Sequence, residues 1–514
     1  MNVFLTSGAL IYNIAIIVIV TAYMLISERS KKRGIEGEDL AMSGRSLHWF
    51  PCAAAIALTS LGGGHVNGIP MMTWGVGYSA MFFIFGNGVA ILIIFRFSGI
   101  WFRRSGCVTV NDLLGKMFHP ALAPILGSLG IMYCWLVICV ETQGMAPLIA
   151  AITGLTNFQA GFAGAAIGIL YMIVAGMKQI GLVNMWNAIL MYLFGFIALF
   201  YLGYAAVGSE QGGFAAVAAL ADSGVRPELF HAMGNPGILR AYAIGTFLSA
   251  AVGLNMAQPQ VQAIGAVPNV NVIKKACLAA IPMNTLIGLI VVGISMMSYA
   301  LPLDIPAGML APGEELMGAQ ALLLVIMQYL PGWLQIAIFG VFLAAILSTF
   351  AMCVLCGVTM LTRDVLNYYP AYRDMSAKKH AVWNRIWILV FAFSAALAAI
   401  TIKENTQPAL TWGFAWNIPT LMIFIIGLYW KRSVKGGFIA FVISWAFNII
   451  LTFIPGVAAF FNLEGNNYSI FMIIASTVVG LIATALDKNC KPSFKTTYKQ
   501  QRALYDAGTP VKLN

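Results

Sequence analysis

Long apolar runs alternate with short polar or glycine-rich connections along the whole chain. The apolar runs are long enough to cross a bilayer as helices, and they lie near residues 8–26, 48–74, 78–101, 122–153, 158–176, 184–206, 239–262, 273–300, 332–363, 381–401, 407–429, 435–455 and 467–486. The stretches between them are too short to hold a soluble domain. The pattern predicts an all-α polytopic membrane protein with about 13 transmembrane helices.

Composition agrees with this class. Of the 514 residues, 60% are hydrophobic and only 9% are charged, and the mean hydropathy is +0.85. Met1 to Ser7 contain no Lys or Arg, and no small-residue cleavage site follows the first apolar run. We therefore expect the first span to be retained rather than removed as a signal peptide.

The basic residues predict the orientation in the membrane. When successive loops are assigned to alternate sides, 26 of the 29 Lys and Arg residues fall on one side, and only Arg226, Arg240 and Lys403 fall on the other. Cytoplasmic loops carry the excess of positive charge. We expect a multi-pass protein of the plasma (inner) membrane, with its N-terminus outside and its C-terminus in the cytoplasm. The outer segments 207–238 and 301–331 are expected to form short surface helices or lids.

A glycine-rich stretch interrupts the window at 48–74. Gly62, Gly63 and Gly64 each disfavour a helix by roughly 1 kcal/mol relative to alanine, and Pro70 removes a backbone donor. Unwound backbone at bilayer depth is tolerated where it lines a cavity or is buried in protein. The stretch predicts a broken helix and a binding site that uses His65 and Asn67. The alternative is a close approach of another helix on the glycines.

Glu141 is the one acidic residue in the middle of a predicted span. A charge at that depth costs about 2.5–3.5 kcal/mol on insertion scales. Two interpretations remain open: a protonated acid bonded to a neighbouring helix, or a contact for a coupling ion, a proton or a cationic substrate. Trp135, Trp412 and Trp416 would add cation–π faces for an amine. His65 would help a carboxylate substrate.

Two adjacent hydroxyls mark the window at 332–363. Ala345, Ser348 and Thr349 share one helical face. Hydroxyls in membrane helices often bond back to their own carbonyls, which is one interpretation. The other is half of a cation site, completed by carbonyls freed at the break near 62–64. An uncharged all-oxygen cage suits Na⁺ better than Zn²⁺ or Cu²⁺.

These motifs together resemble the sodium/solute symporter family. The resemblance covers nearly the whole chain and rests on GRSLHW at 44–49, RSGCVTV at 104–110, GMK at 176–178, AAILST at 344–349 and GLYWKR at 427–432. Within the family, residues 62–68 look most like the first core helix of choline-type members.

The resemblance implies a core of two inverted five-helix repeats, at 48–206 and 239–429. Around it lie the first peripheral span and cytoplasmic loop at 1–47, an extracellular loop at 207–238, two peripheral spans at 430–486 and a cytoplasmic tail at 487–514. It also implies one Na⁺ between the broken helix and the hydroxyl-bearing helix. The ligands would be the carbonyls of Leu58, Leu61 and Ala345 and the hydroxyls of Ser348 and Thr349.

The resemblance places the substrate beside the breaks of two symmetry-related helices. The residues implied are Gly64, His65, Asn67, Asn87 and Asn255, and the amine hypothesis adds Glu141 and Trp412. Two positions depart from the family pattern. Val183-Asn184 stands where many members carry Thr-Asp, which argues against a second cation site, and Gln262-Ala263 stands where many carry Gln-Arg.

We therefore expect a secondary transporter that couples sodium to a small polar solute by alternating access. An amine or amino-acid-like zwitterion and a monocarboxylate are both compatible with the sequence. The alternative is proton-coupled or cation-independent transport by the same fold, and a more distant one is a solute sensor without transport. An enzyme is not expected, because the five histidines are dispersed. The expected partners are the solute, sodium and lipid, with no nucleic acid and no obligatory protein partner.

Overall fold

The computed structural model describes residues 3–31, 38–205, 211–306, 315–402, 407–461, 463 and 467–500. This part of the chain is almost entirely helical. Its two strands, β1 (Lys431–Arg432) and β2 (Lys491–Pro492), form one short antiparallel pair that ties the tail to the end of a long helix. The all-α prediction is confirmed.

Long helices lie at the predicted windows. Nine helical stretches of the described residues are long and apolar enough to cross a membrane, and a bent pair of helices makes ten. Eight of the nine stretches consist mainly of single long helices, which are α1 (Val3–Lys31), α8 (Leu122–Thr153), α10 (Met177–Tyr204), α15 (Val270–Ala300), α17 (Gly332–Met360), α19 (Ala377–Thr401), α21 (Val434–Phe453) and α23 (Tyr468–Leu486). The ninth is the segmented stretch Gly64–Ser105. Helix α20 (Gln407–Tyr429) is a further long helix outside these nine.

The other windows hold shorter or broken helices. The window at 158–176 contains α9, and those at 48–74, 78–101 and 239–262 contain chains of helical segments. These segments are α3 (Trp49–Thr59), η2 (Gly64–Gly68), α4 (Ile69–Val76), η3 (Gly77–Ala80), α5 (Met81–Ile93), η4 (Ile94–Ser98), α6 (Gly99–Ser105), α9 (Asn157–Leu170), η6 (Leu239–Ile244), α13 (Gly245–Gly253) and α14 (Gln258–Gly265).

Gly77 divides the longest of these runs of helical segments. The helical stretch Gly64–Ser105 has 42 residues and would be about 63 Å long if straight, twice the thickness of the hydrocarbon core. Gly77 has φ 59° and ψ −137°, which interrupts it. A Cβ there would lie 1.9 Å from the Leu229 carbonyl oxygen. Only glycine satisfies both the conformation and the close approach.

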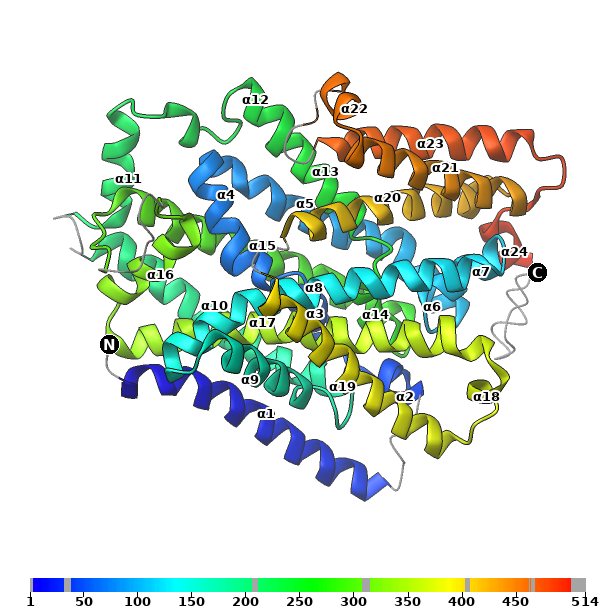
Figure 1. Cartoon of the computed structure of the whole chain (residues 1–514), viewed down its shortest axis with the longest axis horizontal. Helices are drawn as coiled ribbons and strands as arrows, with labels where there is room; N and C mark the ends of the chain where they lie inside the picture. Colours follow the sequence, from blue (N-terminus) through cyan, green and yellow to red (C-terminus); the bar gives the residue numbers. More distant parts are fainter. Residues whose placement is uncertain are drawn as a thin grey trace.

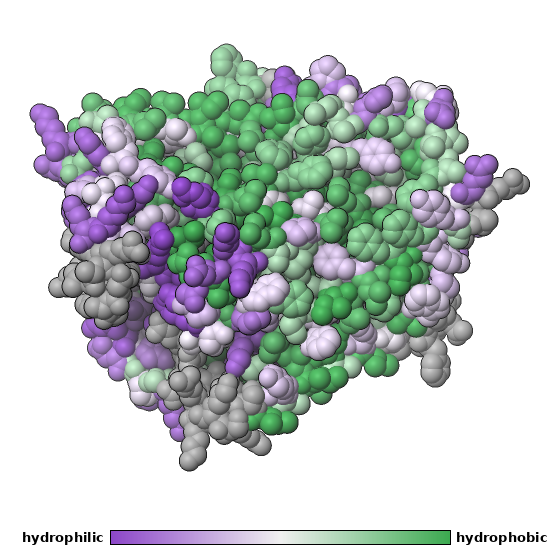
Figure 2. All heavy atoms as spheres, turned by 180° about the vertical axis from the view of Figure 1, so that it is seen from behind, coloured by the Kyte–Doolittle hydropathy of each residue, from purple (hydrophilic) through white to green (hydrophobic). Residues whose placement is uncertain are grey.

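Helix α17 is the centre of the bundle. Its apolar window is fully buried, and it packs against α8, α10 and α1, as Figure 1 shows. Outer helices present large apolar side chains to the surroundings instead. On α1, Ile11, Ile19 and Ile26 are 65%, 66% and 70% exposed. Figure 2 shows hydrophobic side chains across the middle of the opposite face, with hydrophilic ones gathered toward its left end. This is the surface of a protein dissolved in lipid.

Short helices cover the two ends of the bundle (Figure 1). The end near the N-terminus carries α11 (Gly213–Asp222), η5 (Pro227–Leu229), α12 (Pro236–Ile238) and α16 (Gly318–Tyr329), so the two outer segments do contain short helices as predicted. The remaining short elements are α2 (Glu38–Met42), η1 (Ser43–Arg45), α7 (Val110–Met117), η7 (Leu361–Val365), η8 (Leu366–Tyr368), α18 (Pro370–Arg373), α22 (Pro455–Phe460) and α24 (Phe494–Gln500).

Candidate functional site

The glycine-rich stretch is broken as the sequence predicts. Helix α3 ends at Thr59, and Ser60, Leu61 and Gly62 are not helical. The chain then re-enters helix as a π-helical turn, η2, which continues into α4. The Gly62 carbonyl accepts the N–H of His65 at 2.8 Å. The break leaves the last carbonyls of α3 without their usual helical partners.

The hydroxyls of α17 reach these carbonyls. Ser348 Oγ lies 3.3 Å from the Leu58 oxygen and 2.8 Å from the Ala345 oxygen. Thr349 Oγ1 lies 3.3 Å from the Leu58 oxygen and 3.2 Å from the Thr59 oxygen. The structure thus brings four of the five predicted ligand residues together and adds the Thr59 carbonyl, which the sequence analysis missed.

Leu61, the fifth predicted ligand residue, belongs to the same break. Its N–H donates to the Leu58 oxygen at 2.9 Å, and its side chain lines an apolar cavity together with Ala345. The donor set at the break consists of backbone and hydroxyl oxygens. Such hard, uncharged donors match a small hard cation rather than a transition metal.

Glu141 projects from α8 into the same break. Its side chain is 2% exposed, and Oε2 accepts the N–H of Gly63 at 2.6 Å. Two of the three tryptophans predicted to group with Glu141 have other partners. Trp135 lies on another face of α8 and donates to Ser394 Oγ at 3.2 Å, while Trp416 packs against Trp445 on α21. The side chain of Trp412 lies outside the described residues.

An open cavity of about 560 Å³ leads to the break. It reaches Gly63 and is bounded by η2, α8, α9, α16 and α19. Its polar lining consists of amides and one hydroxyl, and no charged side chain is among its lining in the described part of the chain: Asn67, Thr142, Gln143, Asn157 and Gln320. A Cβ on Gly144 would lie 2.8 Å from Asn67 Nδ2, so this glycine makes room for the amide.

His65 faces a different cavity. It is buried against Phe83, with ring centroids 5.7 Å apart, and it lines a small apolar cavity of about 30 Å³ between α10, α15 and α17. Its Nε2 has no hydrogen-bond partner. His65 and Asn67 are two positions apart on a helix and so point to nearly opposite sides. The structure therefore separates two residues that the sequence analysis assigned to one substrate site, while Gly64 between them has open space at its Cβ position.

A second broken helix lies beside the first. Helices α13 and α14 are bent by 43° at residues 254–257, and Asn255 at this break is buried and donates to the Ala251 carbonyl. Ser60 Oγ at the first break donates to Gln260 Oε1 at 3.1 Å. Asn87 lies on α5, which packs against α13, and neither of its amide atoms has a partner. The two breaks are thus directly connected.

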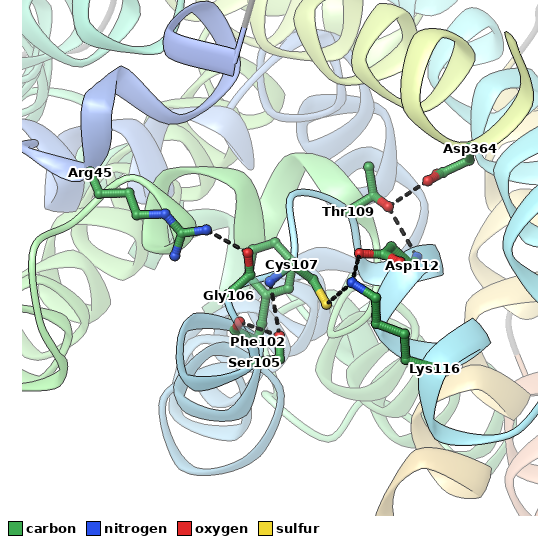
Figure 3. Close-up of polar contacts among 9 residues, drawn as sticks. All are labelled: Arg45, Phe102, Ser105, Gly106, Cys107, Thr109, Asp112, Lys116 and Asp364. Carbon is green, nitrogen blue, oxygen red and sulfur yellow. Dashed lines mark hydrogen bonds and ion pairs between the residues drawn. The ribbon is translucent and has the colours of Figure 1, made fainter. Parts of the chain in front are cut away.

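A polar cluster lies near the opposite end of the bundle, and Figure 3 shows its contact between Thr109 and Asp364. Asp364 in η7 accepts hydrogen bonds from Thr109 Oγ1 at 2.6 Å and from Asn111 Nδ2 at 2.8 Å. Gln258 at the start of α14 accepts the N–H of Val110 at 2.8 Å. The end of α17 and the start of α14 are therefore both bound to residues 109–111. Gln258, the first of the glutamines at 258, 260 and 262, was the available sequence signal for this contact.

Cys107 lies beside this cluster, between α6 and α7. Burial and, to a smaller extent, the neighbouring Asp112 carboxylate raise the pKa of its thiol to about 12, with Lys116 opposing the shift. Lys116 Nζ lies 3.6 Å from the sulfur and 2.6 Å from Asp112 Oδ2 (Figure 3). The thiol is protonated at neutral pH and weakly nucleophilic.

Two interrupted helices that meet deep inside an apolar bundle, with a cavity leading to one of them, define a secondary transporter of the broken-helix class. Residues 41–445 match the sequence model of the sodium:solute symporter family. The chain belongs to this family.

Individual relatives agree in fold. A sodium/glucose cotransporter from Vibrio parahaemolyticus is 21% identical over 475 residues, which cover 87% of this chain and 85% of that protein. The structure of a Na⁺-coupled sialic acid symporter in a substrate-bound outward-open state superimposes with a TM-score of 0.75 at 15% identity, covering 94% of this chain and 98% of the other. A manganese transporter from Eremococcus coleocola gives a TM-score of 0.50 at 12% identity, covering 86% and 94% of the two chains. The protein is a multi-pass membrane transporter and not an enzyme.

Proposed function

We propose that this protein couples the inward movement of Na⁺ to the uptake of a small polar organic solute by alternating access. The observation that carries the proposal is the contact of the Ser348 and Thr349 hydroxyls with the carbonyls of Leu58 and Thr59 at the helix break. These oxygens, with the carbonyls of Leu61 and Ala345, would hold one sodium ion. Membership of a sodium-coupled family supports the same ion.

One ion per cycle is enough for concentrative uptake. A membrane potential of 100 mV is worth about 2.3 kcal/mol per charge, which corresponds to roughly a fifty-fold solute gradient. A second cation site is not part of the proposal. The amide oxygen of Asn184, where many relatives carry an aspartate, is bound by the Tyr171 hydroxyl at 2.6 Å, and it brings no negative charge.

The open cavity is the proposed solute site. Its neutral amides and hydroxyl can both donate and accept hydrogen bonds, which suits a solute without net charge. We therefore favour an amino-acid-like zwitterion over a monocarboxylate or a simple amine, since neither ion would meet an opposite charge on the lining formed by the described residues. Asn67, Gln143 and Gln320 would orient the solute.

The structure has the features of one half of a transport cycle. The cavity opens toward the end of the bundle that carries α16, and the hydrogen bonds of Asp364 with Thr109 and Asn111 would hold the other end closed. The excess of basic residues at that closed end supports a cytoplasmic side there. The proposed repeats, 48–206 and 239–429, each begin with one of the two broken helices.

The sodium site is tested by removing one hydroxyl at a time. We expect Ser348→Ala or Thr349→Ala to raise the sodium concentration for half-maximal uptake by about tenfold, because each loses an oxygen ligand. Uptake would be measured in proteoliposomes against a panel of zwitterionic and carboxylate solutes, with and without a sodium gradient.

A matched control is Thr359→Ala, which removes a hydroxyl from the same helix two to three turns away, where it bonds only to the Leu355 carbonyl. Wild-type sodium dependence in both site variants would reject the site. Uptake driven by a pH gradient alone, with no response to sodium, would favour the proton-coupled alternative instead.

A further inference from the structure

Glu141 is a buried acid that the sodium site proposed above does not include. It lies on a helix that packs extensively against α17, and its side chain is almost fully enclosed. The ion pairs Lys116–Asp112, Arg226–Glu228 and Arg373–Asp374 lie elsewhere in the molecule. A carboxylate in a low-dielectric interior is stable as an anion only beside a positive charge.

Gly62 shows where the carboxylate points. A Cβ on Gly62 would lie 2.3 Å from Glu141 Oε1 and 2.6 Å from Thr349 Oγ1. These two oxygens therefore converge on the same side of the unwound backbone, close enough to share one ion. The second carboxylate oxygen is fixed by the Gly63 N–H at 2.6 Å, which orients Oε1 toward the site.

Thr349 connects this carboxylate to the rest of the donor set. Its hydroxyl also lies 3.3 Å from the Leu58 oxygen and 3.2 Å from the Thr59 oxygen. A carboxylate, a hydroxyl and backbone carbonyls thus surround one short break. Carboxylate and carbonyl oxygens are the donors that hard cations prefer in proteins.

We propose that Glu141 supplies the negative charge of the sodium site, with Oε1 as an anionic ligand next to Thr349. This inference rests on the proposed sodium symport and deepens it. Sodium and the carboxylate neutralise each other inside the membrane, so the loaded site carries no net charge. The ion would also link α8 to the break between α3 and α4. Sodium binding would therefore act directly on the position of this broken helix.

The test is sodium binding itself, measured without transport. The melting temperature of the purified full-length protein in detergent is followed during a NaCl titration, with KCl keeping the ionic strength constant. Sodium that binds only the folded state raises this temperature. Glu141→Gln keeps the shape but loses the charge, and we expect its half-saturating sodium concentration to rise about tenfold or more.

Cys139→Ala is the matched control, because Cys139 lies on the same helix but contacts the Ala395 carbonyl on α19. It should leave the sodium titration unchanged. If Glu141→Gln does not fold, Glu141→Asp and Glu141→Asn give the same comparison, and the charged variant should bind sodium more tightly than the neutral one.

The outcomes separate this inference from the proposed function. If the wild type shows no sodium-dependent shift, the sodium site itself fails, and the role of Glu141 fails with it. If the wild type responds and Ser348→Ala weakens the response, but Glu141→Gln titrates like the wild type, the symport proposal stands and the anionic ligand is overturned.

Discussion

Gly62 and Gly64 belong to the same broken segment but differ in the space available for a side chain. Gly62 has no room for a side chain, because Glu141 and Thr349 occupy the space, whereas a Cβ on Gly64 would meet nothing within 4 Å. Both weaken the helix to a similar extent by propensity. Only Gly62 is also required by packing, and this follows from two side chains of distant helices.

The contrast gives a prediction for stability. Gly62→Ala should destabilise the protein by about 1–3 kcal/mol, because the added methyl group must displace the Glu141 carboxylate and the Thr349 hydroxyl. Gly64→Ala should change stability by no more than about 1 kcal/mol, in the stabilising direction. Thermal unfolding of both variants in detergent checks this. Equal melting temperatures would contradict the packing around Gly62.

Helix α17 connects the proposed ion site with the Asp364 cluster. Ser348 and Thr349 in its middle contact the broken helix, and Asp364 just beyond its end accepts hydrogen bonds from Thr109 and Asn111. Movement of one helix relative to residues 109–111 would therefore change the ion site and the closed end together. Alternating access requires such coupling between ion binding and the opening of one end of the protein.

Removal of Asp364 should weaken the closed end. Asp364→Ala leaves the buried Thr109 hydroxyl and Asn111 amide without their acceptor, at a cost of about 1–3 kcal/mol for each group. We expect a lower melting temperature and faster alkylation of Cys107, which lies beside the cluster. Labelling with a maleimide at fixed pH measures the second effect.

The pH dependence of this labelling follows from the thiol. With a pKa of about 12, Cys107 is protonated at neutral pH, so its reactivity in the closed protein should rise only as the pH approaches that value. The control for Asp364→Ala is Asp374→Ala. The ion pair of Asp374 with Arg373 is exposed and contributes little to stability. If the control accelerated labelling as much as Asp364→Ala, the cluster would not be what protects Cys107.

The two ends of the bundle differ in structure. One end opens through the cavity bounded by Asn157 and Gln320, and the other carries the tail helix α24 and the β1–β2 pair. The start of α1 and the tail helix α24 lie at these opposite ends (Figure 1). Charge bias assigns the second end to the cytoplasm, and the orientation remains a prediction.

Labelling of intact cells tests this orientation. In a Cys490→Ser background, a cysteine at the exposed position Asn157 should react with a membrane-impermeant maleimide from outside. A cysteine at the exposed position Lys488 should react only after permeabilisation. The reverse pattern would overturn the assignment of the two ends, and with it the inward direction of sodium-coupled uptake.

Local physics determined much of this protein from its sequence alone. Apolar length predicted the helices, glycine and proline predicted the break after Thr59, and the spacing of Ala345, Ser348 and Thr349 predicted a shared face. Each of these signals lies within a few residues of the chain. The family resemblance then related the break to the hydroxyls.

Only the tertiary structure decided which atoms meet. The contact of Thr349 with Leu58 joins residues 291 positions apart, and the position of Glu141 over Gly62 depends on how α8 and α17 pack. The separation of His65 from Asn67, and the Asp364 cluster, likewise depend on the register between distant helices. Membrane helices present apolar side chains on most faces, so their pattern does not fix that register, whereas close packing of small and polar residues does.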